Sequence, residues 1–127
     1  MSLQAGDMIS FERTFTTEDV ELFTKVSLDE GAHHLSPDEQ GRLVVQGQLT
    51  ATLPTKVGGD HDVLARRMNF EFLRPVFTDD TIICEVRIDQ YEKQENSRIA
   101  ISASFKCKNQ KEKEVLTGEF SGIILSS

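Results

Sequence analysis

The stretch Ile82-Ile83-Cys84-Glu85-Val86-Arg87-Ile88 has an apolar residue at every second position, while Glu85 and Arg87 lie on its other face. This alternation is typical of a β-strand with one buried face. Three further stretches follow the same period, at residues 68–72, 99–107 and 116–124. Together the four stretches predict an antiparallel meander with one apolar side.

The turn between the second and third stretches predicts how they pair. A turn centred on Glu95-Asn96 aligns the apolar faces, with Cys84 opposite Cys107, Val86 opposite Phe105 and Ile88 opposite Ala103. Other centres that give a turn of even length remain open. Cys84 and Cys107 have no CxxC spacing, so we interpret them as buried apolar residues rather than redox or metal groups.

The first half of the chain predicts one more strand and a short helix. Ile9, Phe11 and Phe15 indicate a strand that ends at Thr16 or Thr17. A helix is expected next, because Thr16 and Asp19 have the spacing of a capping box. Its apolar face would consist of Val20, Phe23 and Val26. The polar residues 27–42 are expected to be irregular.

Residues 46–57 predict a long buried helix, because they contain a single charged side chain, Lys56. Pro54 is expected to kink this helix, and Gly58-Gly59 to end it. One apolar stripe runs along it, formed by Leu49, Leu53 and Val57. The helix and about five antiparallel strands predict an α+β fold in which a curved sheet wraps around the helix, as a single domain over residues 1–127.

The charge balance disfavours one class of partner. The 127 residues contain 14 Lys and Arg against 21 Asp and Glu, a net charge of −7. A nucleic-acid binder gains its affinity from cations, so we expect none here. No apolar run approaches the roughly 18 residues of a membrane helix, and no signal-peptide pattern is visible. We therefore expect a cytoplasmic protein without membrane contact.

Two groups of residues could carry chemistry. Asp29 lies close in sequence to His33 and His34, and a histidine beside a carboxylate can transfer protons near neutral pH. Gly47 at the start of the buried helix could expose N–H groups to a developing oxyanion. Without any catalytic role, His33 and His34 could simply lie in a surface loop, and Gly47 could simply begin a helix. A metal site formed by His33, His34, His61 and Asp60 or Asp62 is a weaker alternative.

Three stretches, at residues 26–34, 41–49 and 69–81, carry a family resemblance. They resemble the MaoC-like branch of the hotdog fold, which contains (R)-specific enoyl-CoA hydratases and 3-hydroxyacyl dehydratases. The segment Phe72-Leu73-Arg74-Pro75-Val76 is the most similar. The resemblance extends over nearly the whole chain and implies the hotdog fold.

The resemblance also implies a set of site residues. The aspartate and histidine of the hydratase motif fall on Asp29 and His34, and the oxyanion-hole glycine falls on Gly47. Substrate-binding positions fall on Gln46 and Thr55. The chain departs from the motif at Leu28, at Gly31-Ala32 and at Ser36, where the family has glycine, asparagine-proline and often an acidic residue. The loss of proline is expected to loosen the loop that holds Asp29 and His34.

The implied function is hydration of trans-2-enoyl thioesters of coenzyme A or an acyl carrier protein, or the reverse dehydration, in fatty acid metabolism. No metal or redox cofactor is expected. Cations would bind the phosphates of the thioester, the candidates being Arg42, Lys56, Arg66, Arg67 and Arg74. The family implies at least a homodimer. A hotdog domain that binds acyl thioesters or serves in assembly without catalysis is the alternative. Thioester hydrolysis is disfavoured, because residues 46–59 contain no carboxylate.

Overall fold

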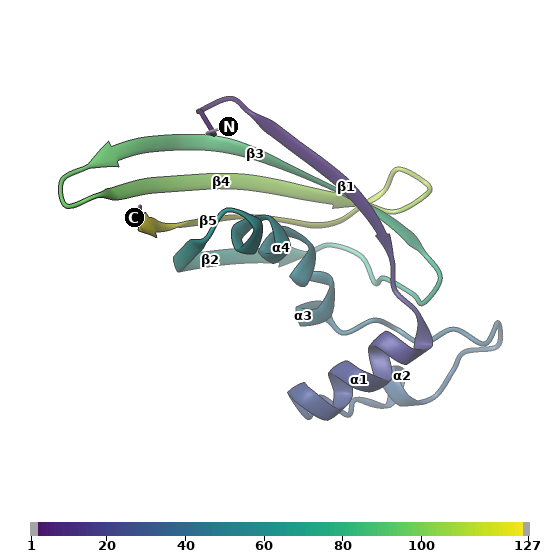
Figure 1. Ribbon diagram of the computed structural model, residues 1–127. Coiled ribbons are helices and arrows are strands. Elements are labelled where there is room, and N and C mark those ends of the chain that lie inside the picture. Colours follow the sequence, from purple (N-terminus) through teal and green to yellow (C-terminus); the bar gives the residue numbers. More distant parts are fainter. Residues whose placement is uncertain (1–2, 126–127) are drawn as a thin grey trace.

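A five-stranded antiparallel sheet dominates the computed structural model, which describes residues 3–125 (Figure 1). The strands are β1 (Met8–Thr14), β2 (Val63–Phe72), β3 (Thr81–Gln94), β4 (Arg98–Lys108) and β5 (Glu114–Leu125). They lie in the order β1-β3-β4-β5-β2, with β1 and β2 at the edges. β3, β4 and β5 form the predicted antiparallel meander, whereas β2 pairs with β5 and not with the next strand, β3, so the prediction of one meander through all four stretches is wrong. The predicted domain also includes residues 1, 2, 126 and 127, which lie outside the described residues.

Four helices connect to this sheet: α1 (Thr17–Ser27), α2 (Ala32–Leu35), α3 (Gly47–Thr50) and α4 (Thr52–Asp60). The curved sheet wraps around α4, which contacts β2 and β3 (Figure 1). Leu53 and Val57 of α4 join Ile82, Val86 and other apolar residues of the sheet in one core. The predicted curved sheet around a buried helix is thus confirmed. Within residues 3–125, no helix is long and apolar enough to cross a membrane.

The predicted register is correct for half of the β3–β4 pair. Cys84 lies opposite Cys107, and Ile88 lies opposite Ala103. A β-bulge follows Ile88, after which the partners shift by one position. The extra residue in β3 leaves a turn of three residues, 95–97, between the last paired residues Gln94 and Arg98. The predicted turn of even length is therefore wrong.

Both cysteines lie inside the sheet's apolar face. Cys84 and Cys107 are free, fully buried and directly opposite each other. A hydrogen bond with Cys84 and burial together raise the pKa of the Cys107 thiol far above its usual value. The thiol stays protonated and packs as a small apolar group, as the sequence indicated.

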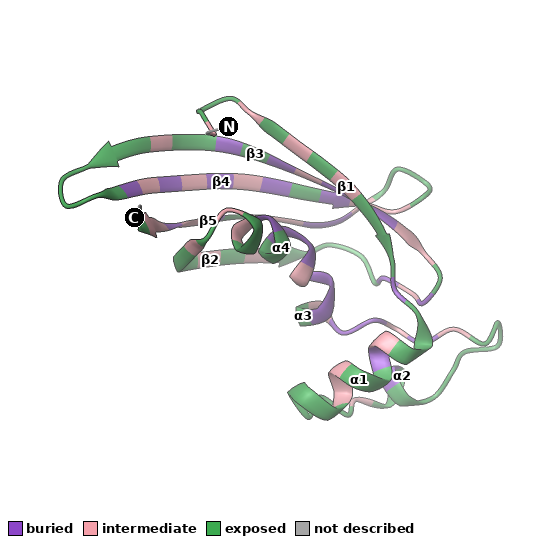
Figure 2. Cartoon of the chain, in the orientation of Figure 1, coloured by how far each residue is buried: buried purple, intermediate pink, exposed green. Residues whose placement is uncertain are grey.

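The predicted capping box of α1 is present, but its apolar face is shorter than expected. Thr16 accepts a hydrogen bond from the backbone N–H of Asp19, whose carboxylate accepts one from the N–H of Thr16. Val20 is buried, whereas Val26 is 81% exposed. The later turns of α1 extend beyond the sheet, where no core is available to cover Val26 (Figure 2).

The predicted long helix is interrupted and ends later than expected. Ala51 separates α3 from α4, three residues before Pro54. Proline lacks the N–H that would bond to the carbonyl of Thr50, which explains the interruption. Gly58 and Gly59 lie inside α4, because helices tolerate glycine at a cost of about 1 kcal/mol each.

Leu28 ends α1 in a conformation that is unfavourable for leucine. Its φ of 61° and ψ of 19° are left-handed, and its N–H donates to the carbonyl of Thr24. Glycine is the usual residue at such a helix end. The side chain of Leu28 is 75% exposed, so little burial offsets the backbone strain.

We predict that Leu28→Gly raises the stability of the protein by about 1 kcal/mol, because it removes left-handed strain. Thermal unfolding should show an increase in Tm of about 4 °C. Leu22→Gly is the matched control, since Leu22 is also exposed but lies within α1, where glycine should lower the Tm. A lower Tm for Leu28→Gly would contradict this account.

Candidate active site

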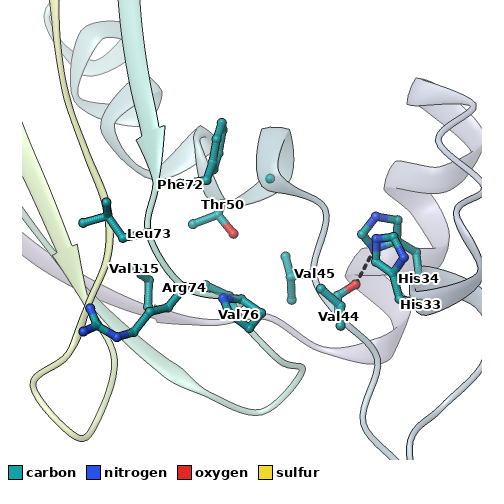
Figure 3. Close-up of a pocket in the computed structure, with 12 residues that line it drawn as sticks. His33, His34, Val44, Val45, Thr50, Phe72, Leu73, Arg74, Val76 and Val115 are labelled. Atoms are coloured by element: carbon teal, nitrogen blue, oxygen red, sulfur yellow. Dashed lines mark hydrogen bonds between the residues drawn. The ribbon is translucent and has the colours of Figure 1, made fainter.

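A cavity of about 300 Å³ lies between α2, the segment before α3 and the end of β2. His33 and His34 lie at one end of it, and Leu73 and Arg74 lie at the other (Figure 3). Its wall includes Val44, Val45, Gly47, Thr50, Phe72, Pro75, Val76 and Val115. The cavity therefore brings together polar groups of α2 and the first residue of α3 inside a largely apolar wall.

His34 is held by the backbone of the segment that precedes α3. Its ring is 5% exposed, and its Nδ1 lies 2.6 Å from the carbonyl oxygen of Val44 (Figure 3). The N–H of Val44 in turn donates to the carbonyl of His33 at 3.0 Å. Two hydrogen bonds thus join α2 to the backbone of Val44, and they set the orientation of the His34 imidazole.

This arrangement determines which nitrogen of His34 can act as a base. A carbonyl oxygen can only accept a hydrogen bond, so Nδ1 carries the hydrogen. In the neutral ring, Nε2 then has a free lone pair. Nε2 lies 3.4 Å from Oδ2 of Asp29, a distance longer than a usual direct hydrogen bond. When the ring is neutral, two hydrogen-bond acceptors face each other, and one of them belongs to the cavity wall.

Asp29 is positioned by the turn that follows α1. Its backbone N–H donates to Oγ of Ser27, and its Oδ1 accepts a weak hydrogen bond from the N–H of Gly31. The other carboxylate oxygen, Oδ2, faces His34. The Asp29 side chain is 50% exposed, so water can reach it. The structure thus brings together the two residues that the sequence singled out.

Gly47 lies in the same cavity as His34 and begins α3. The first N–H groups of a helix have no partner within the helix, so the Gly47 amide is available to another acceptor. A Cβ on Gly47 would lie 2.9 Å from the ring of Phe72. The absence of a side chain therefore lets the Phe72 ring pack closely over the start of α3.

Two predicted substrate-binding residues lie elsewhere. The Gln46 side chain is fully buried and donates from Nε2 to Oγ1 of Thr24 at 2.8 Å, which ties α3 to α1 rather than reaching the cavity. Thr55 donates to the carbonyl of Ala51 and lines a second, apolar cavity of about 180 Å³ beside α4. Neither side chain lies with Asp29 and His34.

The two predicted arginines have different surroundings. Arg74 lines the cavity and donates from Nη1 to the carbonyl of Glu114 at 2.7 Å. Arg42 lies on an exposed loop, where it pairs with Asp38 and stacks over the Phe77 ring at 4.0 Å. A hydrogen bond from the Arg42 backbone N–H is the main cause that lowers the pKa of Asp38. Arg42 thus has local structural partners, while Arg74 faces the cavity.

The proposed metal donors do not converge. In residues 3–125, no three His, Cys, Asp or Glu side chains gather in an arrangement that could hold a metal ion. His61 caps the end of α4, whereas His33 and His34 belong to α2.

Sequence reasoning missed two features of the site. The Val44 carbonyl orients His34, but a backbone group leaves no signal in the type of residue that carries it. The alternation at residues 68–72 predicts Phe72 on the apolar face of a strand, yet its half-exposed ring covers Gly47. Its position at the end of an edge strand was the available signal.

Comparison with known proteins identifies the fold. The thioesterase superfamily matches residues 50–112, a range that excludes Asp29, His34 and Gly47. A mitochondrial 3-hydroxyacyl-[acyl-carrier-protein] dehydratase of Arabidopsis thaliana is 26% identical over 130 residues, which cover 96% of this chain and 78% of that protein.

Solved structures agree with this result. An (R)-hydratase of A. caviae involved in PHA biosynthesis superimposes with a TM-score of 0.83 and 22% identity, covering 98% of both chains. A MaoC-like dehydratase of Rhodospirillum rubrum has a TM-score of 0.76 and 13% identity, covering 98% of this chain and 94% of that one. These comparisons confirm the hotdog fold, and the matched proteins are named (R)-hydratase, MaoC-like dehydratase and 3-hydroxyacyl-[acyl-carrier-protein] dehydratase.

We predict that neutral His34 carries its hydrogen on Nδ1. Two-dimensional ¹⁵N NMR of the imidazole should show Nδ1 as the protonated nitrogen and Nε2 as the unprotonated one, because Nδ1 bonds to the Val44 carbonyl. His34→Gln assigns the signal, and His61 serves as the comparison. Protonation at Nε2 in the neutral ring would contradict the arrangement.

Proposed function

We propose that this hotdog-fold chain is a hydro-lyase that adds water to trans-2-enoyl thioesters or removes it from 3-hydroxyacyl thioesters. The observation that carries the proposal is the pair of acceptors, His34 Nε2 and Asp29 Oδ2, 3.4 Å apart beside the cavity that contains Gly47. Such a pair suits a reaction whose first requirement is an activated water.

A water molecule satisfies both acceptors when it donates one hydrogen to Nε2 of His34 and the other to Asp29. Its oxygen lone pairs then point away from the pair, toward a substrate in the cavity. The water oxygen forms a bond to C3 of the enoyl group while one of the two residues takes a proton from it. That residue, now protonated, delivers the same proton to C2. Dehydration follows the same steps in reverse.

Gly47 supplies the second requirement, which is stabilisation of charge on the thioester oxygen. Attack at C3 moves electron density to that oxygen, and a free backbone N–H can donate to it. The Gly47 amide lies at the start of α3, where the N–H groups carry partial positive charge. Phe72 packs over this residue and would form one wall of the thioester site.

The comparisons support the catalytic interpretation over a binding or assembly role. The Arabidopsis thaliana relative and the two solved structures described above match over nearly the whole chain, and their names are hydratase or dehydratase. The altered loop around Leu28 and Gly31 still brings Asp29 and His34 together. Water addition to a conjugated double bond requires a base, an acid and a polarised carbonyl, so the proposal includes no metal or redox cofactor.

The substrate would extend from the cavity in two directions. Arg74 is the cation at the cavity wall and would bind a phosphate of coenzyme A or phosphopantetheine. The apolar cavity that contains Thr55, Gly58 and Met68 would receive the acyl chain along α4. Whether coenzyme A or a carrier protein presents the thioester can be decided by comparing both as substrates.

A homodimer formed through β2 is part of the proposal. In residues 3–125, β2 pairs only with β5, so its outer edge carries backbone groups available to a second strand. Phe72 is the last residue of β2 and Leu73 comes directly after it, and both line the cavity. Both residues are about half exposed. Pairing of two β2 strands would extend the sheet and cover these side chains.

We predict that sedimentation equilibrium gives twice the 14.3 kDa mass of the chain. Leu64→Asp should shift the protein toward monomer, because Leu64 is an exposed apolar residue of β2. Ile83→Asp is the control, since Ile83 is also exposed but lies on β3. A monomeric wild-type protein, or equal effects of both variants, would count against this interface.

The cytoplasm is the proposed compartment. Cys84 and Cys107 are free thiols although they lie opposite each other, which suits a reducing environment. The Arabidopsis thaliana relative is named mitochondrial. Cell fractionation of the source organism distinguishes the two compartments.

We predict that Asp29→Asn lowers kcat for hydration of crotonyl-CoA by about 100- to 10,000-fold, because it removes a group that activates water. The assay follows the loss of ultraviolet absorbance of the conjugated thioester. Asp89→Asn is the matched control, since Asp89 lies on β3 outside the cavity, and its activity should equal that of the wild type.

Other enoyl chain lengths and carrier-linked substrates should be tested in the same way. If wild type and Asp29→Asn are equally inert toward all of them, the hydro-lyase proposal fails. Thermal stabilisation by acyl-CoA without turnover would then identify a binding domain.

A further inference from the structure

A second histidine lies against the proposed catalytic one. The ring centroids of His33 and His34 are 3.9 Å apart, with the ring planes tilted by 57°. Both side chains line the cavity, and they lie side by side at one end of it (Figure 3). The proposed mechanism uses His34 and gives His33 no role.

Gly31 explains how both rings fit. A Cβ at this position would lie 2.9 Å from Cε1 of His33, closer than real Cβ atoms approach, and 3.4 Å from Cδ2 of His34. It would also lie 3.5 Å from Oδ1 of Asp29. Three side chains therefore converge on the space that a side chain at residue 31 would occupy.

The backbone conformation at residue 31 does not require glycine. Its φ of −53° and ψ of 140° are accessible to any residue. A side chain at residue 31 would first meet the ring of His33, which is exposed to solvent and would have to move out of its place to make room. The change at Gly31, which appears in the sequence as a loss of rigidity, thus makes room for an aromatic ring at residue 33.

We propose that His33 is a positioning residue whose ring braces His34 against rotation, and that Gly31 is required because it makes room for that ring. The backbone bond to Val44 holds one side of the His34 ring, and His33 packs against the ring itself. The inference deepens the proposed function, since the braced atom is Nε2, which faces Asp29.

Packing, rather than charge, is the property that a brace requires. Contact between the rings depends on an aromatic group at residue 33, so phenylalanine should replace histidine while alanine should not. A brace holds the reacting groups in place after the substrate has bound. Its loss should therefore reduce kcat much more than it changes KM, because small displacements of catalytic groups reduce rates strongly.

Kinetics of four variants test the proposal. His33→Ala should lower kcat by up to about 100-fold with little change in KM, and His33→Phe should restore most of the lost activity. His61→Phe is the matched control, since it replaces a histidine outside the cavity and should leave activity unchanged. Gly31→Ala should also lower kcat, because its Cβ displaces the His33 ring.

The decisive comparison is Gly31→Ala in the His33→Ala background. There the ring that the new Cβ would meet is absent, so the second substitution should cost little. Equal losses from Gly31→Ala in both backgrounds would overturn the proposal. Full activity of His33→Ala, or failure of His33→Phe to restore it, would overturn it as well.

A second readout does not depend on turnover. The ring-proton NMR signals of His34 should move in His33→Ala and Gly31→Ala and stay in place in His61→Phe, because they report the neighbouring ring. Unchanged His34 signals in His33→Ala would refute the brace. An inactive wild-type protein that shows the expected signal changes would instead refute the hydro-lyase function and leave the brace supported.

Discussion

The apolar concave face of the sheet is the constraint on which the rest of this structure depends. Its residues become stable only when something covers them, and α4 provides that cover with Leu53 and Val57. Burial of each such side chain contributes about 1.5–3 kcal/mol. A helix nearly free of charge suits this place, and its position brings α3 and Gly47 to the end of the sheet.

The same constraint extends to the proposed catalytic histidine through backbone hydrogen bonds. The N–H of Val45 donates to the carbonyl of Val76, which fixes the segment before α3 to the connection between β2 and β3. The neighbouring Val44 carbonyl then orients His34. The imidazole belongs to a short helix outside the sheet, yet its orientation derives from the sheet. This linkage explains how a loop with an altered motif still holds Asp29 and His34 together.

The departures from the hydratase motif have separate physical meanings. Leu28 lies where the family has glycine, and it adopts the left-handed conformation that glycine favours, at the expense of strain. Gly31 shows the opposite relation, because its backbone is ordinary and its missing side chain is what the neighbours require. Residue 28 thus has a strained backbone for its residue type, whereas residue 31 matters through the packing around His34.

The sequence by itself determined the strands, which have alternating apolar residues, and the capped start of α1. Apolar alternation predicted the strands, and the capping box predicted the start of α1, because these signals act between residues close along the chain. The pairing of Cys84 with Cys107 could be predicted because a short turn joins two strands whose apolar faces must align. Spacing and resemblance also predicted Asp29 and His34 as candidate site residues, and the structure brings their side chains together.

Only the tertiary structure decided the rest. The bulge after Ile88 set the length of the turn between β3 and β4. The burial of Gln46 removed it from the cavity, and the Val44 carbonyl determined which nitrogen of His34 is free. Each of these outcomes depends on contacts between residues far apart along the chain, and such contacts exist only once the sheet has closed around α4.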